Sequence, residues 1–235
     1  MAHQNRINNY LPFLDSLIAL PGAKAINCGA YGIGAGGPNF VYTVPTGKRA
    51  AVGYAHGFSN SGAAGTCSQI IRVSSTNYTI NTNISYSASN LAFLNQSMII
   101  LEAGEQYGYT LTGANPNCFT QVIEFDNTAP LRTYKNLALT SGDNTLYTVP
   151  AGKTAYPIKG RMGFSAAFNV GAVQLITNNG TMYHVPNGGS KGSNNQMSIS
   201  TATTSQHWGS MNAGDFIVVN VGSTAGFGWI NVVEV

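Results

Sequence analysis

The sequence predicts an all-β protein that consists of two tandem antiparallel β-sandwich domains with an extended N-terminal arm. Short β-branched and aromatic runs are separated by Gly, Asn, Ser and Pro clusters. These turn signals recur about every eight to twelve residues, a spacing that is typical of an antiparallel sandwich or barrel. Three motifs occur twice in the same order, which indicates two copies of one fold. Outside the arm, no segment has a convincing helical pattern.

The repeated motifs divide the chain into two modules. They are VYTVPTGK (41–48) and LYTVPAGK (146–153), LEAGE (101–105) and MNAGD (211–215), and QVIEF (121–125) and NVVEV (231–235). The first pair is separated by 105 residues and the other two by 110, so the second copy carries a small net insertion. We assign residues 1–37 to the arm, 38–128 to the first module and 129–235 to the second. Each module is near the usual domain size of about 100 residues.

The arm belongs to neither repeat. The run 11–20 could form two turns of helix, with Pro12 tolerated in the first turn and Pro21 ending it. Its apolar side chains nearly surround the helix axis, so this short segment must pack on something else. The run 28–37 is rich in glycine and is predicted to be an extended linker. The candidate anchors for a partner are the apolar residues Leu11, Phe13, Leu14, Leu17 and Ile18.

The first two motifs predict tight turns. In the first, Pro45 fits position i+1 of a type I turn and Gly47 fits position i+3. In the second, Gly104 at position i+2 permits the positive φ of a type II turn. Lys48 and Lys153 are then turn residues that face solvent.

The composition favours a protein that works in an assembly. Charged residues make up only 8% of the chain, against roughly 25% in ordinary globular domains. The surface must therefore consist mainly of Ser, Thr, Asn, Gln and Gly, which form a neutral surface able to make hydrogen bonds. Such a surface loses little when a neighbour covers it, whereas free monomers usually carry more charge for solubility.

Several partners and compartments are disfavoured. The net charge is +3, and Lys and Arg form no run, so we expect no nucleic acid partner. No segment offers about 18 uninterrupted apolar residues, so we expect no membrane span. The N-terminus lacks the pattern of a secretory signal. Cys28, Cys67 and Cys118 are odd in number and widely spaced, which indicates free, buried thiols in a reducing compartment.

The sequence shows no arrangement typical of catalysis. Glu102 and Glu105 form one close carboxylate pair in the sequence, but the predicted turn already accounts for both. Glu124 and Asp126 share one face of a strand, which we expect to face solvent. The four histidines have no partner at metal-ligand spacing, and no nucleophile motif occurs. We therefore expect that the protein is not an enzyme and has no metal or cofactor.

The repeated motifs also resemble those of a known group of proteins. A YTVPAGK turn near the start, an AGD turn and a closing strand that ends in VEV resemble the small β-sandwich modules of tailed-phage virion proteins. The resemblance covers residues 38–235, and the first module departs from it at Thr46 and Glu105. It implies jelly-roll-like sandwiches, frequent trimers and no cofactor.

The expected function is that of a virion structural protein, either a capsid decoration protein or a cement protein. It would be assembled in the bacterial host cytoplasm as a homotrimer. It would bind the major capsid protein and other virion proteins through the arm and the sandwich surfaces. The alternative is a tail, neck or fibre-associated protein that binds a host glycan. In that case Trp208 and Trp229 are the candidate residues for stacking on sugar rings.

Overall fold

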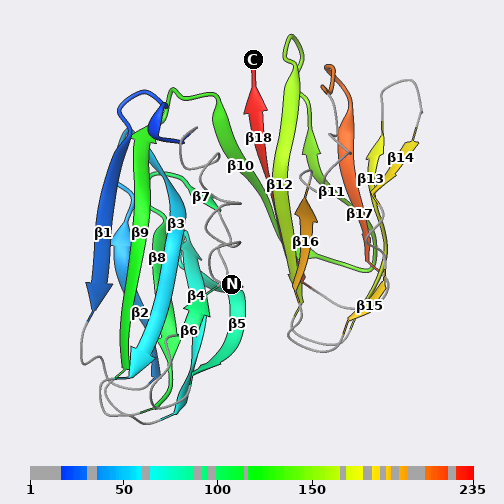
Figure 1. Ribbon diagram of the computed structural model, residues 1–235. Helices are drawn as coiled ribbons and strands as arrows, with labels where there is room; N and C mark the ends of the chain where they lie inside the picture. The colour runs from blue at the N-terminus through cyan, green and yellow to red at the C-terminus, as the bar shows by residue number, and fades with distance from the viewer. Residues whose placement is uncertain are drawn as a thin grey trace, which may run out of the picture. The chain divides into compact units, whose positions relative to one another are not determined.

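The computed structural model describes residues 17–30, 36–59, 64–86, 92–94, 99–113, 116–164, 168–176, 182–185, 189–191, 196–200, 210–221 and 226–235. The chain divides into two compact units between Ala129 and Pro130. Module 1 denotes the β-sandwich formed by the strands of the first unit, and module 2 denotes the one formed by the strands of the second unit (Figure 1). All regular elements within the described parts of both modules are strands, which confirms the predicted all-β fold class.

Module 1 contains the strands β1 (Lys24–Ala30), β2 (Gly36–Thr43), β3 (Lys48–Ser59), β4 (Gly65–Val73), β5 (Thr76–Tyr86), β6 (Ala92–Leu94), β7 (Ile100–Leu101), β8 (Gln106–Leu111) and β9 (Pro116–Asp126). One sheet has the order β1-β9-β3-β6, with β7 also paired to β3, and the other has the order β2-β8-β4-β5. Every pairing is antiparallel. A five-stranded and a four-stranded sheet connected in this order form a jelly-roll sandwich.

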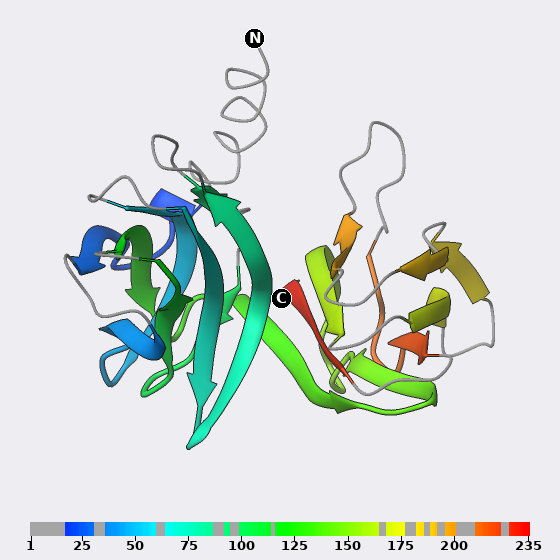
Figure 2. The ribbon, with the colours of Figure 1, turned by 90° about the horizontal axis from the view of Figure 1, so that it is seen from below.

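Module 2 contains the strands β10 (Leu131–Leu139), β11 (Gly142–Thr148), β12 (Ala155–Phe164), β13 (Phe168–Ile176), β14 (Met182–Val185), β15 (Gly189–Lys191), β16 (Gln196–Ser200), β17 (Phe216–Val221) and β18 (Gly226–Glu234). Its sheets have the orders β10-β18-β12-β16 and β11-β17-β13-β14, with β15 also paired to β13. The eight main strands have the same order as in module 1, but the extra strand β15 lies in the sheet of β13, whereas β7 lies in the sheet of β3. The two layers of strands in each module can be followed in Figures 1 and 2.

The repeat begins earlier than the sequence analysis placed it. Strand β1 (Lys24–Ala30) pairs with β9, just as β10 pairs with β18 in module 2. Residues 24–30 therefore belong to the first sandwich, and the prediction that the whole range 1–37 lies outside it is wrong. The partner strand β9 is distant in the sequence, so no local pattern indicated this pairing.

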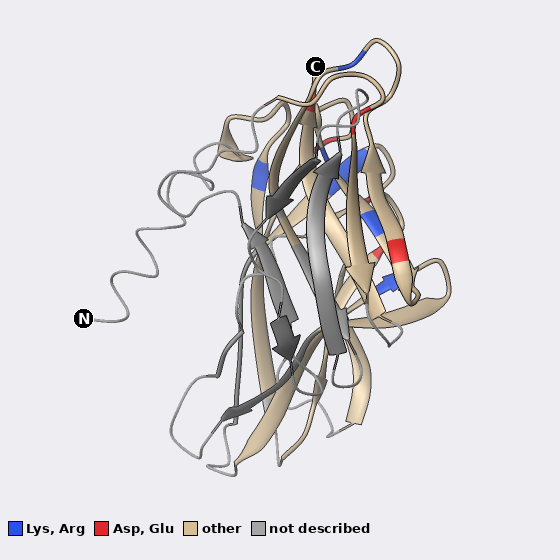
Figure 3. Cartoon of the chain, turned by 90° about the vertical axis from the view of Figure 1, so that its right-hand side faces the viewer, with Lys and Arg blue, Asp and Glu red and all other residues tan. Residues whose placement is uncertain are grey.

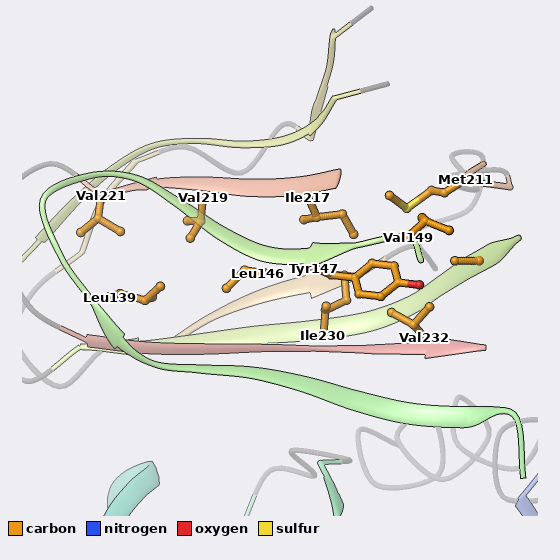
Figure 4. Packing of buried hydrophobic residues seen from close by; sticks show 11 residues of the cluster. Leu139, Leu146, Tyr147, Val149, Met211, Ile217, Val219, Val221, Ile230 and Val232 are labelled. Carbon is orange, nitrogen blue, oxygen red and sulfur yellow. The ribbon is translucent and has the colours of Figure 1, made fainter. Parts of the chain in front are cut away.

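Each module has a buried interior between its two sheets. In module 2, a cluster of buried side chains from both sheets fills this space (Figure 4). It consists of Leu139, Leu146, Tyr147, Val149, Ala155, Met211, Ile217, Val219, Val221, Ile230 and Val232. Strands β8 and β17, which occupy equivalent places, have the same burial pattern: the second, fourth and sixth residues are buried, the first and fifth are half-buried, and the third is buried as well. The period of two is that of strands with one face toward a core.

Candidate functional site: the arm-side end of module 1

The first repeated motif forms a turn that is shifted by one residue from the prediction. The Lys48 amide donates to the Pro45 carbonyl at 3.2 Å, so Pro45 is at position i and Gly47 at position i+2. Gly47 has a φ of 78°, the positive value that a type II turn requires there. The prediction of a type I turn with Pro45 at i+1 is therefore wrong. The equivalent turn of module 2 repeats the geometry, with Gly152 at a φ of 74°.

The second motif forms the predicted type II turn. The Glu105 amide donates to the Glu102 carbonyl at 3.0 Å, and Gly104 between them has a φ of 82°. The Glu105 carboxylate also accepts a hydrogen bond from the Glu102 amide at 2.9 Å. In module 2, Asp215 accepts from the Asn212 amide at 2.8 Å. The acid of this motif thus closes its own turn in both modules.

The two motifs lie side by side in each module. The Val44 amide donates to the Glu105 carbonyl at 3.0 Å, and the Gly104 amide donates back to the Val44 carbonyl at 2.9 Å. Module 2 has the same pair of bonds between Val149 and the Gly214–Asp215 segment, at 3.0 and 2.8 Å. The motifs therefore recur together because each turn supplies the hydrogen-bond partners of the other.

A tyrosine–glutamate hydrogen bond joins the two sheets of each module. Tyr42 on β2 donates to Glu124 on β9 at 2.8 Å, and Tyr147 on β11 donates to Glu234 on β18 at 2.9 Å. Glu124 is half-buried and bonds across the sandwich, whereas the Asp126 side chain on the same strand face is 40% exposed, so the predicted solvent-facing position holds for Asp126 but only in part for Glu124. Burial raises the pKa of both Tyr42 and Tyr147 above the ordinary tyrosine value, and the adjacent carboxylates raise it further.

The chain enters module 1 through a fixed turn, which we call the arm root (Leu17–Ala23). The Asp126 amide, at the end of β9, donates to the Pro21 carbonyl at 2.9 Å. Gly22 has a φ of 66°, and a Cβ at this position would lie 2.5 Å from the Asp126 carboxylate. That carboxylate accepts from Lys48 Nζ at 2.7 Å, so Lys48 is ion-paired and not simply a solvent-facing turn residue. Lys153 is exposed, as predicted.

Arg49 secures the opposite side of this end of module 1. Its side chain is 3% exposed, and Nε donates to both Glu102 carboxylate oxygens at 3.0 and 2.9 Å. Nη1 donates to the Ala129 carbonyl at 2.8 Å, at the end of the unit. One buried guanidinium thus connects strand β3, the second motif and the last residue of the unit. The sequence analysis did not single out Arg49, because its partners are 53 and 80 residues away.

The predicted anchor residues are described only in part. Leu17 is 1% exposed and Ile18 is 61% exposed, both within the arm root. Leu11, Phe13 and Leu14 lie outside the described residues, as does most of the predicted helix 11–20. Leu17 and Ile18 are helical, and the Leu20 amide donates to the Leu17 carbonyl at 3.1 Å, so the described end of this segment is the end of a helix followed by a turn before Pro21. Ile18 is therefore the one described anchor residue that presents a large apolar side chain to solvent.

The candidate glycan residues do not form a described platform. Trp229 is 1% exposed, and Phe227 stacks on it with ring centroids 5.7 Å apart. A sugar ring cannot reach the buried face of Trp229, so this residue does not have the expected accessibility. Trp208 lies outside the described residues.

The described carboxylates all have hydrogen-bond partners within their own module. They are Glu102, Glu105, Glu124, Asp126, Asp143, Asp215 and Glu234. Figure 3 shows how few of the described residues are charged. No group of three or more potential metal-ligating residues occurs among the described residues. Nor does the described part of the chain include a helix long and apolar enough to cross a membrane.

The cysteines lie on three strands of module 1. Cys67 and Cys118 are buried and Cys28 is half-buried, and all three are free thiols, as predicted. Burial raises the pKa of Cys28 and of Cys67 above the ordinary thiol value. A protonated, buried thiol is a poor nucleophile, so these residues have the environment of structural cysteines.

Comparisons with known proteins show only distant likenesses. No protein-family model and no curated protein sequence matches the chain. The major capsid protein of bacteriophage PM2 is similar at 13% identity and a TM-score of 0.40, over 91% of this chain and 98% of that one. HutD from Pseudomonas fluorescens is similar at 9% identity and a TM-score of 0.27, over 91% of this chain and 80% of HutD. A turret protein of Sulfolobus turreted icosahedral virus is similar at 14% identity and a TM-score of 0.24, over 91% of this chain and 98% of the turret protein. All three TM-scores lie below 0.5, so these likenesses carry no weight for function.

Proposed function

We propose that this chain is a structural protein of a virus particle, which binds the capsid shell and stabilises it as a decoration or cement protein. The repeated motifs resemble those of tailed-phage virion modules, and the fold is a jelly roll present twice. A chain with only 8% charged residues has a largely neutral surface, which suits permanent burial against neighbouring subunits. The assembly unit we propose is a homotrimer, which sedimentation of the purified protein would test.

The use of the carboxylates is the observation that carries this proposal. Each of the described acids bonds to a backbone amide, a tyrosine, an amide side chain or a basic side chain of its own module. A catalytic acid must lie within hydrogen-bond reach of the proton that it transfers, whereas the described bonds of these acids all go to groups of the fold itself. The described carboxylates therefore serve to hold each sandwich together internally, which suits a structural protein.

The attachment we propose runs through the N-terminal arm. The arm root is fixed to the end of β9 by the Pro21–Asp126 bond and by the close approach of Gly22 to the Asp126 carboxylate. A segment that leaves a rigid body at a fixed point can direct its apolar residues to one place on a neighbour. Ile18, which is 61% exposed, lies at the start of the described chain and is one such residue.

A truncation tests this attachment without damage to the sandwich. Deletion of residues 1–16 removes Leu11, Phe13 and Leu14 but leaves strand β1 and the arm root intact. We expect the truncated protein to fold normally but to lose binding to purified capsids that lack the protein. The control is a full-length variant with Asn8 and Asn9 changed to Ser, which keeps the apolar residues and should bind as the wild type does. Unchanged binding and unchanged heat resistance of the capsids after truncation would contradict the proposed attachment.

A further inference from the structure

The two modules share a fold, but their interiors differ in chemistry. In module 2, the inward positions of β17 and β18 hold Ile217, Val219 and Ile230, all at most 1% exposed. The equivalent positions of β8 and β9 in module 1 hold Tyr107, Tyr109 and Thr120, which are likewise fully buried. The jelly roll therefore does not require polar groups at these places, since the second copy folds around aliphatic ones.

Strand β4 adds an amide to this polar interior. Gln69 is opposite Tyr109 in the β4–β8 pair, and its side chain is 0% exposed. In module 2, the residue opposite Val219 in the equivalent β13–β17 pair is Val173. A Val occupies the register position of Gln69 in the other copy, so the amide is a specific property of module 1.

Three polar atoms of this interior have no hydrogen-bond partner in the described part of the chain. They are both amide atoms of Gln69, Oε1 and Nε2, and the Tyr107 hydroxyl. Tyr109, by contrast, donates its hydroxyl to the Phe119 carbonyl at 2.9 Å. Burial without a partner costs a polar group about 1–3 kcal/mol, so three such atoms in one core need an explanation.

The unpartnered atoms lie close to one another. Burial raises the pKa of Tyr107 above the ordinary tyrosine value, and the adjacent Tyr109 and Gln69 side chains partly oppose this rise. Gln69 and Tyr107 are therefore neighbours, although they do not meet the geometry of a direct hydrogen bond. A small molecule that both donates and accepts hydrogen bonds would satisfy all three atoms at once.

We propose that the interior of module 1 binds water at a site formed by the Gln69 amide and the Tyr107 hydroxyl. Water can accept from Gln69 Nε2, donate to Gln69 Oε1 and bond in either direction with the Tyr107 hydroxyl. Buried waters of this kind commonly make about three hydrogen bonds to groups that would otherwise lack partners. The core of module 2 offers only aliphatic side chains at the equivalent inward positions and stays dry.

A crystal structure at a resolution that shows ordered water tests the site directly. We expect water density within hydrogen-bond distance of both the Gln69 amide and the Tyr107 hydroxyl, and none between Val219 and Ile230 in module 2. A direct Gln69–Tyr107 hydrogen bond, or apolar packing against both groups without water density, would overturn the proposal.

Paired variants test the same site in solution. In a Cys28→Ala background, alkylation of the buried Cys67 and Cys118 reports the opening of module 1. Gln69→Leu removes the amide and leaves water and Tyr107 short of partners, so we expect thiol alkylation to become about 10-fold faster. The double variant Gln69→Leu with Tyr107→Phe removes the polar site entirely and should recover most of that loss. Unchanged or slower alkylation in Gln69→Leu alone would show that the amide was unsatisfied, and would overturn the proposal.

Discussion

Tyr42 and Glu124 form a 2.8 Å hydrogen bond that joins the two sheets of module 1, and Tyr147 and Glu234 form its counterpart in module 2. In module 2 the same Glu234 oxygen also accepts a bond from Tyr134, whose ring lies against that of Tyr147 with centroids 4.4 Å apart. The bond is therefore part of the repeated fold, and the second copy has reinforced it with another tyrosine.

Loss of this bond should loosen one module at a time. Because a hydrogen bond to a charged group contributes about 1.5–3 kcal/mol, we expect Tyr147→Phe to lower the free energy of unfolding of module 2 by about 1 kcal/mol or more. Both tryptophans belong to the second half of the chain, so urea unfolding followed by tryptophan fluorescence measures this change. Tyr42→Phe is the matched control, and it should leave the fluorescence midpoint in place. Equal midpoints for Tyr147→Phe and the wild type would contradict this role of the bond.

The buried guanidinium of Arg49 should be among the more sensitive positions in module 1. Arg49→Met keeps the apolar stem but leaves the Ala129 carbonyl and the Glu102 carboxylate without their donor. We expect a loss of about 1–3 kcal/mol, because the Glu102 side chain is 40% exposed and water can replace part of the pair. The rate of Cys67 and Cys118 alkylation in urea measures this loss.

Lys48→Met is the matched control for Arg49→Met. Its ion pair with Asp126 lies at the surface, where both side chains keep contact with water. We expect a much smaller effect on thiol protection than for Arg49→Met. If the two variants were equally stable, Arg49 would not hold this end of the module together.

Gly108 should tolerate no side chain. A Cβ there would lie 2.2 Å from the Asn39 carbonyl oxygen and 2.8 Å from the Phe40 Cα, both backbone atoms of β2. We expect Gly108→Ala to destabilise module 1 by about 3 kcal/mol, because rotation of a side chain cannot relieve this overlap. Gly47→Ala is the comparison, since it meets nothing within 4 Å and suffers only from a φ of 78°, which costs about 1 kcal/mol. Thiol alkylation measures the denaturant midpoint of each variant. A lower midpoint for Gly47→Ala than for Gly108→Ala would show that the β2–β8 contact is looser than described.

Alkaline conditions should unfold module 1 before module 2. Burial raises the pKa of Tyr42, Tyr107 and Tyr109 in module 1, and of Tyr147 in module 2. A tyrosine whose folded pKa exceeds its unfolded value of about 10 stabilises the fold fully below that pH, and this contribution is lost as the pH rises further.

The comparison of two pH values measures this effect. We expect the denaturant midpoint of module 1 to fall more than that of module 2 between pH of about 8 and about 11, where unfolded tyrosines ionise. The fraction of thiols alkylated in a brief pulse after return to neutral pH reports module 1, and tryptophan fluorescence reports module 2. Parallel falls in the two midpoints would show that the buried tyrosines of module 1 do not control its response.

The sequence predicted the fold class and the tandem arrangement because repeated turns leave a local signature. The glycines at positions 104 and 214 must adopt a positive φ, and such positions are visible in a single sequence. Strand β1 was missed because it pairs with β9, a partner some ninety residues away, and the adjacent glycines suggested a linker. Pairings between distant segments depend on packing, which a local pattern does not record.

The polar contacts of the candidate site could be predicted from the sequence only in part. Tyr42 and Glu124 recur as Tyr147 and Glu234, so a comparison of the two repeats could have indicated that these residues act together. Arg49 has no counterpart, since Thr154 occupies its place in module 2, and no repetition marks it. The predicted turn began one residue before the observed one, because Pro45 occupies the first position of the observed turn and not the second.

The number of copies of this chain in purified virus particles tests the central claim most directly. Quantitative mass spectrometry of particles, with the major shell protein as the internal reference, gives this ratio. A shell-binding structural protein should be present in a number comparable to that of the shell protein, and the copies should be released when residues 1–16 are deleted. A few copies per particle would place the protein in the tail or neck, and its absence from particles would contradict a structural role in the virion altogether.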